Sequence, residues 1–236
     1  MAVKIEGIDM PRFLVLRLDG PMQAWWTHTY EDFRPSNLFP TRSGLLGLLG
    51  ACLGIDRNDH AGLGRLAASV EFAVRVDRSA LRPGCDKPVD KESTKLVDFH
   101  TVLAARKVDG SANKNAIVSR REYLYDAAFT VAVEEKSGAS VKLEAIADAL
   151  RRPAFTPALG RRSCPTTRPL LDSGVIEAVD AKACLAGVLP HGGMVYAEGA
   201  LVSDQPMQMR DVPVLGRTRQ FSTRRVYVHK GSDHVP

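Results

Sequence analysis

Arginines placed beside turns are the residues of this sequence best suited to binding chemistry. One group lies at Phe39–Gly44, where Arg42 and Ser43 precede a run of apolar residues. Amide groups at a helix start point outward with partial positive charge, and arginine adds a permanent cation whose forked donors fit a phosphate. The motif predicts a phosphate-binding helix start, with an ordinary capped helix and a solvated arginine as an equally good interpretation.

A second arginine group lies at Leu159–Pro165. Gly160 permits a close backbone approach or a positive φ angle. The three polar residues that follow it are Arg161, Arg162 and Ser163. Their side chains offer hydrogen bonds to a sugar–phosphate backbone, although a surface loop with paired charges is the alternative. Because residues 151–171 contain five arginines and no acid, the segment favours RNA binding over that alternative.

A long polar stretch at residues 77–120 has little sustained periodicity. An insertion of this length within a compact domain is usually functional or disordered, and we expect a projecting arm or hairpin. Basic residues within it include Lys87, Lys91, Lys95, His100, Arg106, Lys107 and Lys114. Such an arm can lie over a nucleic-acid strand. Acidic residues within the same stretch make docking on a protein neighbour an equally good interpretation.

Catalytic and metal-binding patterns are weak in this sequence. The six histidines have no metal spacing and no evident nucleophile partner, and the four cysteines include no Cys-x-x-Cys pair. Gly44, Gly47 and Gly50 lack the accompanying lysine and serine or threonine of a phosphate-binding loop, which disfavours nucleotide hydrolysis. No cofactor or metal is expected. A histidine ribonuclease stays open, because residues that meet in space need not be neighbours in sequence.

Composition and charge are those of an ordinary globular protein with a basic balance. Hydrophobic residues make up 44% and charged residues 25%, the net charge is +5, and the pI is about 9.1. No segment approaches the roughly 18 apolar residues that span a bilayer, and Lys4, Glu6 and Asp9 argue against a secretion signal. We therefore expect a cytoplasmic protein. Residues 210–230 contain six basic residues and one acid, so segregated charge predicts a basic face.

The elements that must position these residues follow from periodicity. Apolar residues 13–18 predict a strand, and a helix is predicted from Thr41 or Ser43 to Gly54. Further elements are expected at 60–69 (helix), 70–76 (strand), 127–133 (buried strand, within regular structure at 123–133) and 141–150 (helix). The order strand, helix, strand, insertion, strand, helix predicts an α+β fold of the ferredoxin-like, RNA-recognition-motif type.

The chain is expected to divide near residue 155. Residues 10–155 form the predicted ferredoxin-like RNA-binding domain, and residues 156–236 form a β-rich extension packed on it, with antiparallel strands at 193–201, 208–214 and 225–229. Residues 1–9 are expected to be a flexible lead. One of Trp25 and Trp26 is expected in the core, since tryptophans near a strand end are more often buried.

Several sequence blocks resemble a known family. They begin with Leu16-Arg17-Leu18-Asp19-Gly20-Pro21-Met22-Gln23-Ala24-Trp25 and Arg34-Pro35, and they continue at 39–50, 98–103, 121–124, 159–165 and 219–221. Through these blocks the chain closely resembles the CasD family of the type I-E CRISPR Cascade complex, from Met10 onward.

The resemblance implies a modified RNA-recognition fold that caps the 5′ handle of the CRISPR RNA in antiviral defence. Residues 77–120 would be a thumb-like hairpin insertion. The implied partners are the CRISPR RNA, a neighbouring backbone subunit and the large subunit that reads the flanking motif of the target DNA. Because a separate ribonuclease cuts the guide in type I-E systems, the resemblance implies a non-catalytic subunit. A sister group in type I-C systems does cut the RNA precursor.

The motifs and the resemblance together predict which residues bind RNA. Arg42, Arg161 and Arg162 would hold handle phosphates, and Met22, Gln23 and Trp25 would face the RNA. The full predicted set is Met22, Gln23, Trp25, Arg34, Arg42, Ser43, His100, Arg106, Gly160, Arg161, Arg162, Ser163 and Arg219. Two alternatives stay open: a metal-independent endoribonuclease that processes CRISPR RNA precursor, and a protein-only scaffold whose basic surface meets acidic partners.

Overall fold

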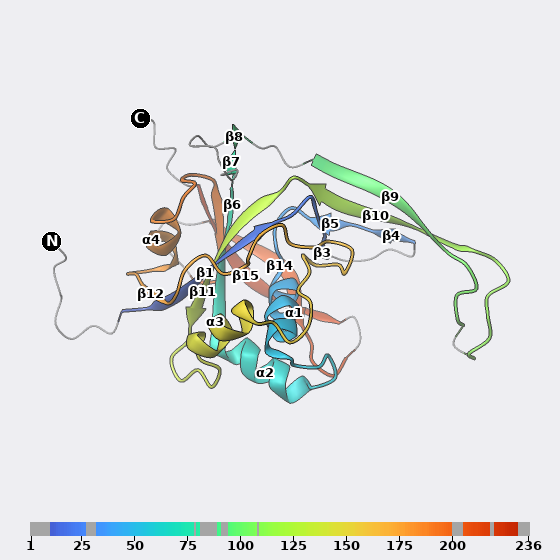
Figure 1. Ribbon diagram of the computed structural model, residues 1–236, viewed down its shortest axis with the longest axis horizontal. Coiled ribbons are helices and arrows are strands. Elements are labelled where there is room, and N and C mark those ends of the chain that lie inside the picture. Colours follow the sequence, from blue (N-terminus) through green and yellow to red (C-terminus); the bar gives the residue numbers. More distant parts are fainter. Residues whose placement is uncertain are drawn as a thin grey trace.

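The centre of the fold is a seven-stranded antiparallel sheet (Figure 1). The computed structural model describes residues 10–26, 32–77, 79–80, 89–90, 94–107, 109–199, 205–217 and 220–230, so the expected lead at 1–9 lies outside the described residues. The strand order is β12-β1-β11-β6-β13-β15-β14. These strands are β1 (Arg12–Asp19), β6 (Val70–Val76), β11 (Ala128–Glu135), β12 (Ile176–Glu177), β13 (Met194–Ala197), β14 (Gln205–Pro213) and β15 (Phe221–Lys230).

Two crossover connections build the first four strands of this sheet. The chain leaves β1 through α1 (Arg42–Leu53) and α2 (His60–Ser69) and returns as β6, with β11 between the two strands. It leaves β11 through α3 (Leu143–Arg151) and returns as β12, with β1 between them. The predicted order of strand, helix, strand, strand and helix is therefore confirmed, and the fold is a mixed α/β structure with antiparallel sheets.

The ends of α1 are fixed by the residues that the sequence indicated. The Thr41 side chain accepts a hydrogen bond from the Gly44 amide, and Gly54 ends the helix with φ of 72°. A left-handed residue at this position favours glycine because a Cβ atom would be strained there. Inside the helix, Leu45 and Leu49 are buried against the sheet and α3. The predicted helix start and stop are confirmed.

The two faces of the sheet are covered differently because successive strand residues point to opposite sides. Leu14, Leu16 and Leu18 of β1 belong to the large core beneath α1 and α3. Phe13 and Val15 face a smaller core under α4 (Ala181–Ala186). Neither α4 nor the two-residue β12 was expected from the sequence.

A buried polar network crosses three neighbouring strands on the α4 side of the sheet. The Thr130 hydroxyl accepts hydrogen bonds from Arg17 at 2.8 Å and Arg75 at 3.0 Å, and it donates one to Asp77 at 2.7 Å. The Arg75 guanidinium also donates to Asp77 at 2.6 Å. Burial raises the pKa of the Asp77 carboxyl, against the opposing effect of Arg75 and Thr130. These contacts satisfy the polar groups that this face buries.

A long hairpin projects from the body as an arm (Figure 1). Its strands are β9 (Thr94–Val102) and β10 (Ile117–Tyr125), which pair from Val102 opposite Ile117 to Thr94 opposite Tyr125. The expected insertion is thus confirmed as a hairpin. Its inner end is part of the body, however, because Tyr123 and Leu124 of β10 are buried in the core.

Short strands complete the architecture around the arm. β2 (Met22–Gln23) and β4 (Phe33–Arg34) pair with β10, and β3 (Trp25–Trp26) pairs with β5 (Ser36–Asn37). β7 (Ser79–Ala80) pairs with β8 (Val89–Asp90). The segment that follows β1 is therefore fastened along the inner half of the arm.

The C-terminal strands continue the central sheet at its edge. β13 pairs with β6, and β15 then joins β13 to β14. The three strands predicted in this region are present, with bounds that differ by a few residues. Within the described ranges, no helix is both long enough and apolar enough to cross a membrane.

Candidate nucleic-acid interface

The loop at residues 159–165 is fastened to the core at both ends. Leu159 and Cys164 are fully buried, and the Leu159 amide donates to the Cys164 carbonyl at 2.8 Å. The Ala24 amide donates to the Leu159 carbonyl at 3.1 Å, which joins the loop to the segment after β1. Between these anchors, Arg162 and Ser163 are exposed. A rigid loop thus presents a cation and a hydroxyl to solvent.

Gly160 is the residue that makes this loop geometry possible. Its φ angle is +86°, in the left-handed region where residues with a Cβ atom are strained. A Cβ atom at this position would also overlap the carbonyl oxygen of Ala24. The expected positive φ angle is confirmed, and the close backbone approach seen in the structure is to Ala24 of the same chain.

Arg161 holds the loop against the base of the arm. Its guanidinium donates to the carbonyl oxygens of Glu122 and Arg34, each at 3.2 Å, and it lies 4.8 Å from the ring centroid of Tyr123. Arg162 has no hydrogen bond or ion pair within the part of the chain that the structure describes, and it is exposed. The two adjacent arginines therefore differ: Arg161 positions the loop, while Arg162 is available to a ligand.

Glu122 ties three chain segments together at the same place. Its carboxylate accepts hydrogen bonds from the Lys95 ammonium at 2.9 Å and the Ser36 amide at 3.0 Å. Partial burial opposes ionisation, but the hydrogen bonds from Lys95 and Ser36 and the charges of Lys95 and Arg161 outweigh it and lower the pKa of Glu122. The carboxylate thus stays charged and fixes the arm base.

His100 contributes a second polar group at the arm base. Its Nε2 atom lies 3.1 Å from the Tyr123 hydroxyl and 2.9 Å from the Asp98 carboxylate. His100 is half-buried, and the Arg161 guanidinium lies over the ring of the same Tyr123. Of the predicted residues, the structure therefore gathers Arg34, His100 and Arg161 around Tyr123.

Neither Tyr123 nor Glu122 was among the residues predicted to bind RNA. Alternation between polar and apolar residues is weak along β10, because its outer half is exposed and its inner half is buried. In the hairpin register, Arg121 lies opposite Asp98 and Tyr123 lies opposite Leu96. Pairing the two strands in this register would have placed Tyr123 next to the site.

The prediction that Arg42 holds a phosphate is wrong. Its guanidinium is buried, forms an ion pair with Glu198, and donates to the Ala67 carbonyl at 2.7 Å. The backbone amide of Arg42 donates to the Asp211 carboxylate at 2.7 Å. Acidic groups of the same chain therefore bind both the Arg42 guanidinium and the backbone amide at the start of α1. The ordinary capped-helix interpretation holds, except that the arginine is buried and not solvated.

The prediction that Gln23 and Trp25 face RNA is also wrong. Neither side chain has exposed surface. The Trp25 indole donates to the Gln23 side-chain oxygen at 3.0 Å, and the Gln23 amide donates to the carbonyls of Leu18 and Ala127 at 2.9 and 2.7 Å. These bonds satisfy the polar atoms of both residues inside the core, where one of the two tryptophans was expected.

The remaining predicted residues are distributed over several elements. Met22 and Arg34 are half-buried beside β10, and Ser43 is half-buried at the start of α1. Arg106 is exposed on the outer part of the arm, where it pairs with Ala112. Arg219 lies outside the described residues.

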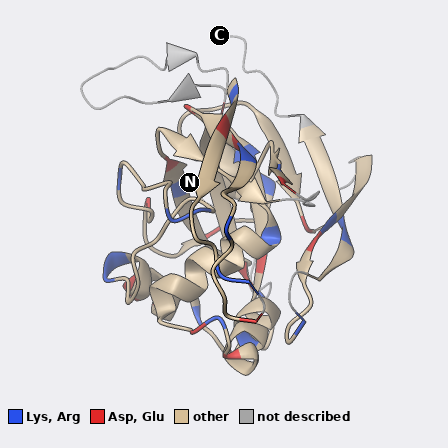
Figure 2. Ribbon diagram, turned by 90° about the vertical axis from the view of Figure 1, so that its right-hand side faces the viewer, with Lys and Arg blue, Asp and Glu red and all other residues tan. Residues whose placement is uncertain are grey.

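Charge on the arm side of the molecule is mixed. Figure 2, in which the arm points toward the viewer, shows basic and acidic residues interspersed. Ion pairs such as Lys95–Glu122 at 2.9 Å and Arg120–Asp32 at 3.5 Å account for part of this mixture. Charge that is segregated in the sequence is therefore partly neutralised in the fold, and individual unpaired arginines matter more than the net charge.

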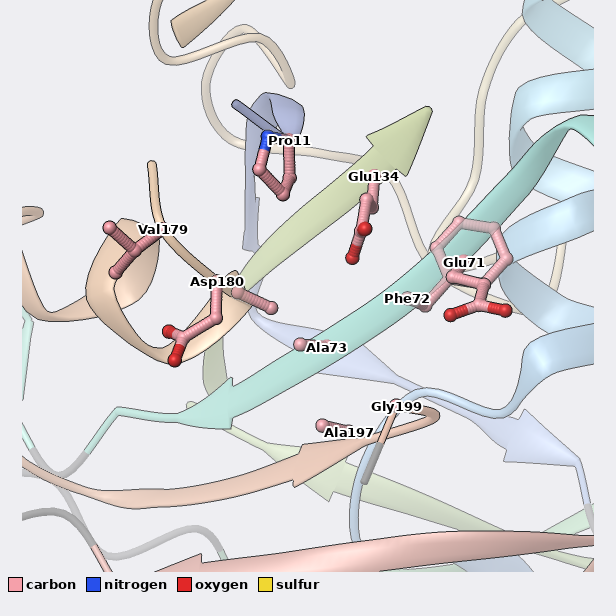
Figure 3. Close-up of a pocket in the computed structure, with 10 residues that line it drawn as sticks. Pro11, Glu71, Phe72, Ala73, Glu134, Val179, Asp180, Ala197 and Gly199 are labelled. Carbon is pink, nitrogen blue, oxygen red and sulfur yellow. The ribbon is translucent and has the colours of Figure 1, made fainter. Parts of the chain in front are cut away.

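A pocket between α4 and the sheet has the wrong charge for RNA (Figure 3). It has a volume of about 200 Å³, and its carboxylates belong to Glu71, Glu134 and Asp180. Burial, followed by the charges of Glu71 and Asp180, raises the pKa of Glu134. Phosphates are disfavoured there by like charge. No group of three or more metal-ligating side chains occurs among the described residues.

Three of the four cysteines lie in the described part of the chain as free thiols. Cys52, Cys164 and Cys184 are buried and unbonded. Burial raises the pKa of Cys52 to about 11 and that of Cys184 to about 12. Cys85 lies outside the described residues. Thiols that are protonated and buried pack as small hydrophobic groups.

Comparison with known proteins gives one consistent family. The family described as CRISPR-associated protein (Cas_Cas5) matches residues 13–227. The CRISPR system Cascade subunit CasD of Escherichia coli (strain K12) is 46% identical over 228 residues, which cover 96% of this chain and 99% of that protein. A chain of a CRISPR RNA-guided surveillance complex has a TM-score of 0.71 at 31% identity, covering 93% of this chain and 90% of its own length. A crystal structure of a Cas protein has a TM-score of 0.62 at 28% identity, covering 92% and 94%.

Proposed function

The chain belongs to the Cas5 family of CRISPR-associated proteins, and we propose that it is the Cascade subunit that caps the 5′ handle of the guide RNA in a type I-E system. The observation that carries this proposal is the loop at 159–165, whose exposed tip is held rigidly beside the arm. The relatives of the chain support the proposal, because one is a Cascade subunit and another belongs to a CRISPR RNA-guided surveillance complex.

Neighbouring residues of the loop have different roles in the proposed RNA contact. Arg162 and Ser163 bind handle phosphates, because their exposed side chains offer charge-assisted and neutral hydrogen bonds. Gly160 lets the backbone approach the RNA, and its own packing against Ala24 keeps the loop in one conformation. Arg161 acts indirectly, through its contacts with Tyr123 and the Glu122 carbonyl. Rigid placement of this kind reduces the entropy lost on binding.

The arm provides the proposed contacts with other subunits. Phe99 on β9 is 68% exposed, and Leu103, which directly follows β9, is 77% exposed. Such exposure is unusual for large apolar side chains. Arg106 follows them and extends the handle contact toward the first guide segment. We assign the apolar arm surface to a neighbouring backbone subunit and the body to the large subunit, so target DNA is contacted only through the assembly.

The finer fold assignment supports the same proposal. The strand order β12-β1-β11-β6, with antiparallel neighbours and two helical crossovers, matches a β-α-β-β-α-β unit of the ferredoxin-like type. RNA-recognition motifs share this arrangement. We propose that residues 10–155, with the arm inserted, supply β1, β6, β11 and the two crossovers, that β12 beyond them completes the unit, and that β13–β15 extend it. An RNA-bound role also keeps the chain in the cytoplasm, as the sequence led us to expect.

We propose that the subunit is not an enzyme, with a metal-independent ribonuclease as the second candidate. The observation that favours the second candidate is His100, whose ring nitrogen lies 3.1 Å from the Tyr123 hydroxyl near Arg161. Incubation of the purified chain with precursor RNA in a chelator tests it. We expect intact RNA, and cleavage that His100→Ala abolishes would overturn the non-catalytic assignment.

The handle contact is tested by binding across salt concentrations. The double variant Arg162→Ala/Ser163→Ala is expected to lower the affinity of the chain for handle RNA about fivefold or more and to reduce the salt slope by about 0.7, the value for one phosphate contact of a single strand. Arg57→Ala, which removes an exposed arginine from the turn before α2, is the matched control. Unchanged affinity and slope in the double variant would remove this loop from the RNA contact.

A further inference from the structure

The outer face of β14 and β15 is an open, cationic and partly aromatic surface that the proposed handle contact does not use. We infer that this C-terminal sheet face binds a single strand of RNA. Its members alternate along the two strands: Gln208, Arg210, Thr223, Arg225 and Tyr227. The inference goes beyond the proposed function, because it concerns a different surface and stands whether or not the loop at 159–165 binds the handle.

Strand register brings these side chains together. Gln208 lies opposite Arg225, and Arg210 lies opposite Thr223. The two arginines are therefore diagonal neighbours, about 7–8 Å apart at Cα. Val226 is buried and lies opposite Met207, which belongs to the core on the α1 side, so the alternating residues named above point away from α1.

The charge of this face is not neutralised within the described part of the chain. Arg225 is exposed and has no hydrogen bond or ion pair there. Arg210 uses only its Nε atom, which donates to the Phe221 carbonyl at 2.9 Å, so the rest of its guanidinium is held in place and exposed. Asp211 is the acid of these two strands, and it points to the other face, where Arg224 binds it at 2.6 and 2.7 Å.

α1 contacts β14 from the opposite face of the sheet, which these side chains point away from. α4 contacts β1, β6 and β11, which lie toward the other end of the strand order. The exposure of Gln208, Arg210, Thr223 and Arg225 agrees with this arrangement. The surface is thus a shallow open sheet and not an enclosed pocket.

These groups match the chemistry of a single RNA strand. Two adjacent guanidinium groups bind phosphates, and the half-buried Tyr227 ring provides a stacking surface for a base. The Gln208 amide and Thr223 hydroxyl can donate to and accept from a ribose 2′-hydroxyl, which distinguishes RNA from DNA. A duplex cannot expose its bases to such a surface, so an unpaired strand is the fitting ligand.

The test measures how tightly the parent chain and three variants of it bind a 20-nucleotide oligouridylate that has no handle sequence. We expect Arg210→Gln/Arg225→Gln to weaken binding about fivefold or more and to reduce the salt slope by about 1.4, equivalent to two phosphate contacts. Arg210→Lys/Arg225→Lys should retain most of the slope. Arg57→Gln/Arg65→Gln removes the same charge from exposed positions elsewhere and should change neither quantity.

Three outcomes would overturn the inference. The first is an unchanged affinity and slope in the glutamine variant, as expected if the face binds an acidic protein. The second is an affinity for oligothymidylate equal to or above that for oligouridylate, which contradicts the assignment to RNA. The third is loss of the effect when Arg162→Ala/Ser163→Ala is already present, because independent sites give additive changes. Failure of the handle test leaves the first two readouts intact, so the two proposals fail separately.

Discussion

The carboxylate of Asp211, on β14, accepts a hydrogen bond from the backbone amide of Arg42, the first residue of α1, at 2.7 Å. The same carboxylate binds Arg224 through two further hydrogen bonds. Because Arg42 in turn pairs with Glu198, the N-terminal helix and the C-terminal strands share one buried ionic cluster. The helix dipole is thus met by a carboxylate of the same chain.

Replacement of Asp211 by asparagine is expected to destabilise the fold. The variant keeps the size of the side chain but removes one of the two carboxylates that pair with the half-buried Arg224, the other being Glu198. We expect a cost of about 2–4 kcal/mol of unfolding free energy. Urea denaturation measures this change, with Asp148→Asn on the exposed side of α3 as the control. Unchanged stability together with altered RNA affinity would instead restore the helix start as an RNA site.

Replacement of Gly160 by alanine is expected to disturb the loop at 159–165. The positive φ angle and the overlap of a Cβ atom with the Ala24 carbonyl both oppose the change. We expect a loss of about 2 kcal/mol or more in unfolding free energy, since backbone strain and a steric clash add. Gly174→Ala is the control, because a Cβ atom there meets no neighbouring atom. Equal thermal midpoints for the two variants would contradict the geometry.

Glu122 is expected to make the arm base sensitive to acid. Its pKa is lowered from the ordinary value of 4.5, so its carboxylate stabilises the folded state above that value and the contribution disappears as pH falls through the lower, folded-state pKa. Glu122→Gln should therefore lose less stability than the parent chain between about pH 5 and pH 3. Unfolding free energies measured over this range test the difference. An exposed control, Glu177→Gln, should follow the parent curve.

The apolar surface of the arm is expected to serve assembly and not folding. Phe99→Ser/Leu103→Ser should change unfolding free energy by less than about 0.5 kcal/mol, because both side chains are mostly exposed. The same variant should weaken association with the reconstituted backbone subunits about tenfold or more, as expected for large apolar anchors of an interface. Thr101→Ser, on the same strand, is the control. Full assembly by the double serine variant would contradict the assignment.

Local chemistry made much of the fold predictable. Thr41 and Gly54 mark the ends of α1 by capping, and Asp59 precedes α2 in the same way, so both helices were expected at their observed positions. The strand at Val70–Val76 follows from its apolar residues. The six-residue α4 has too few turns to give a periodic pattern, and β9 exposes both faces, which removes the usual alternation.

The candidate site was less predictable, because partners that are distant in sequence determine which of its residues are buried and which are exposed. Arg42 turns inward toward Glu198 and Asp211, and the latter lies 169 residues away in sequence. Arg161 and Arg162 are indistinguishable by type, and only the positions of Tyr123 and the Glu122 carbonyl show which of them is engaged. Turn chemistry did identify Gly160, since its conformation is a local property.

We propose that this chain holds the 5′ handle of a guide RNA at the loop beside the arm. Photo-crosslinking of the assembled complex, loaded with RNA that carries 4-thiouridine at single handle positions, tests it most directly. We expect crosslinked peptides that contain residues 159–165 and the inner half of the arm, and a loss of the loop crosslink in Arg162→Ala/Ser163→Ala. Handle crosslinks confined to other subunits, with none in this chain, would contradict it.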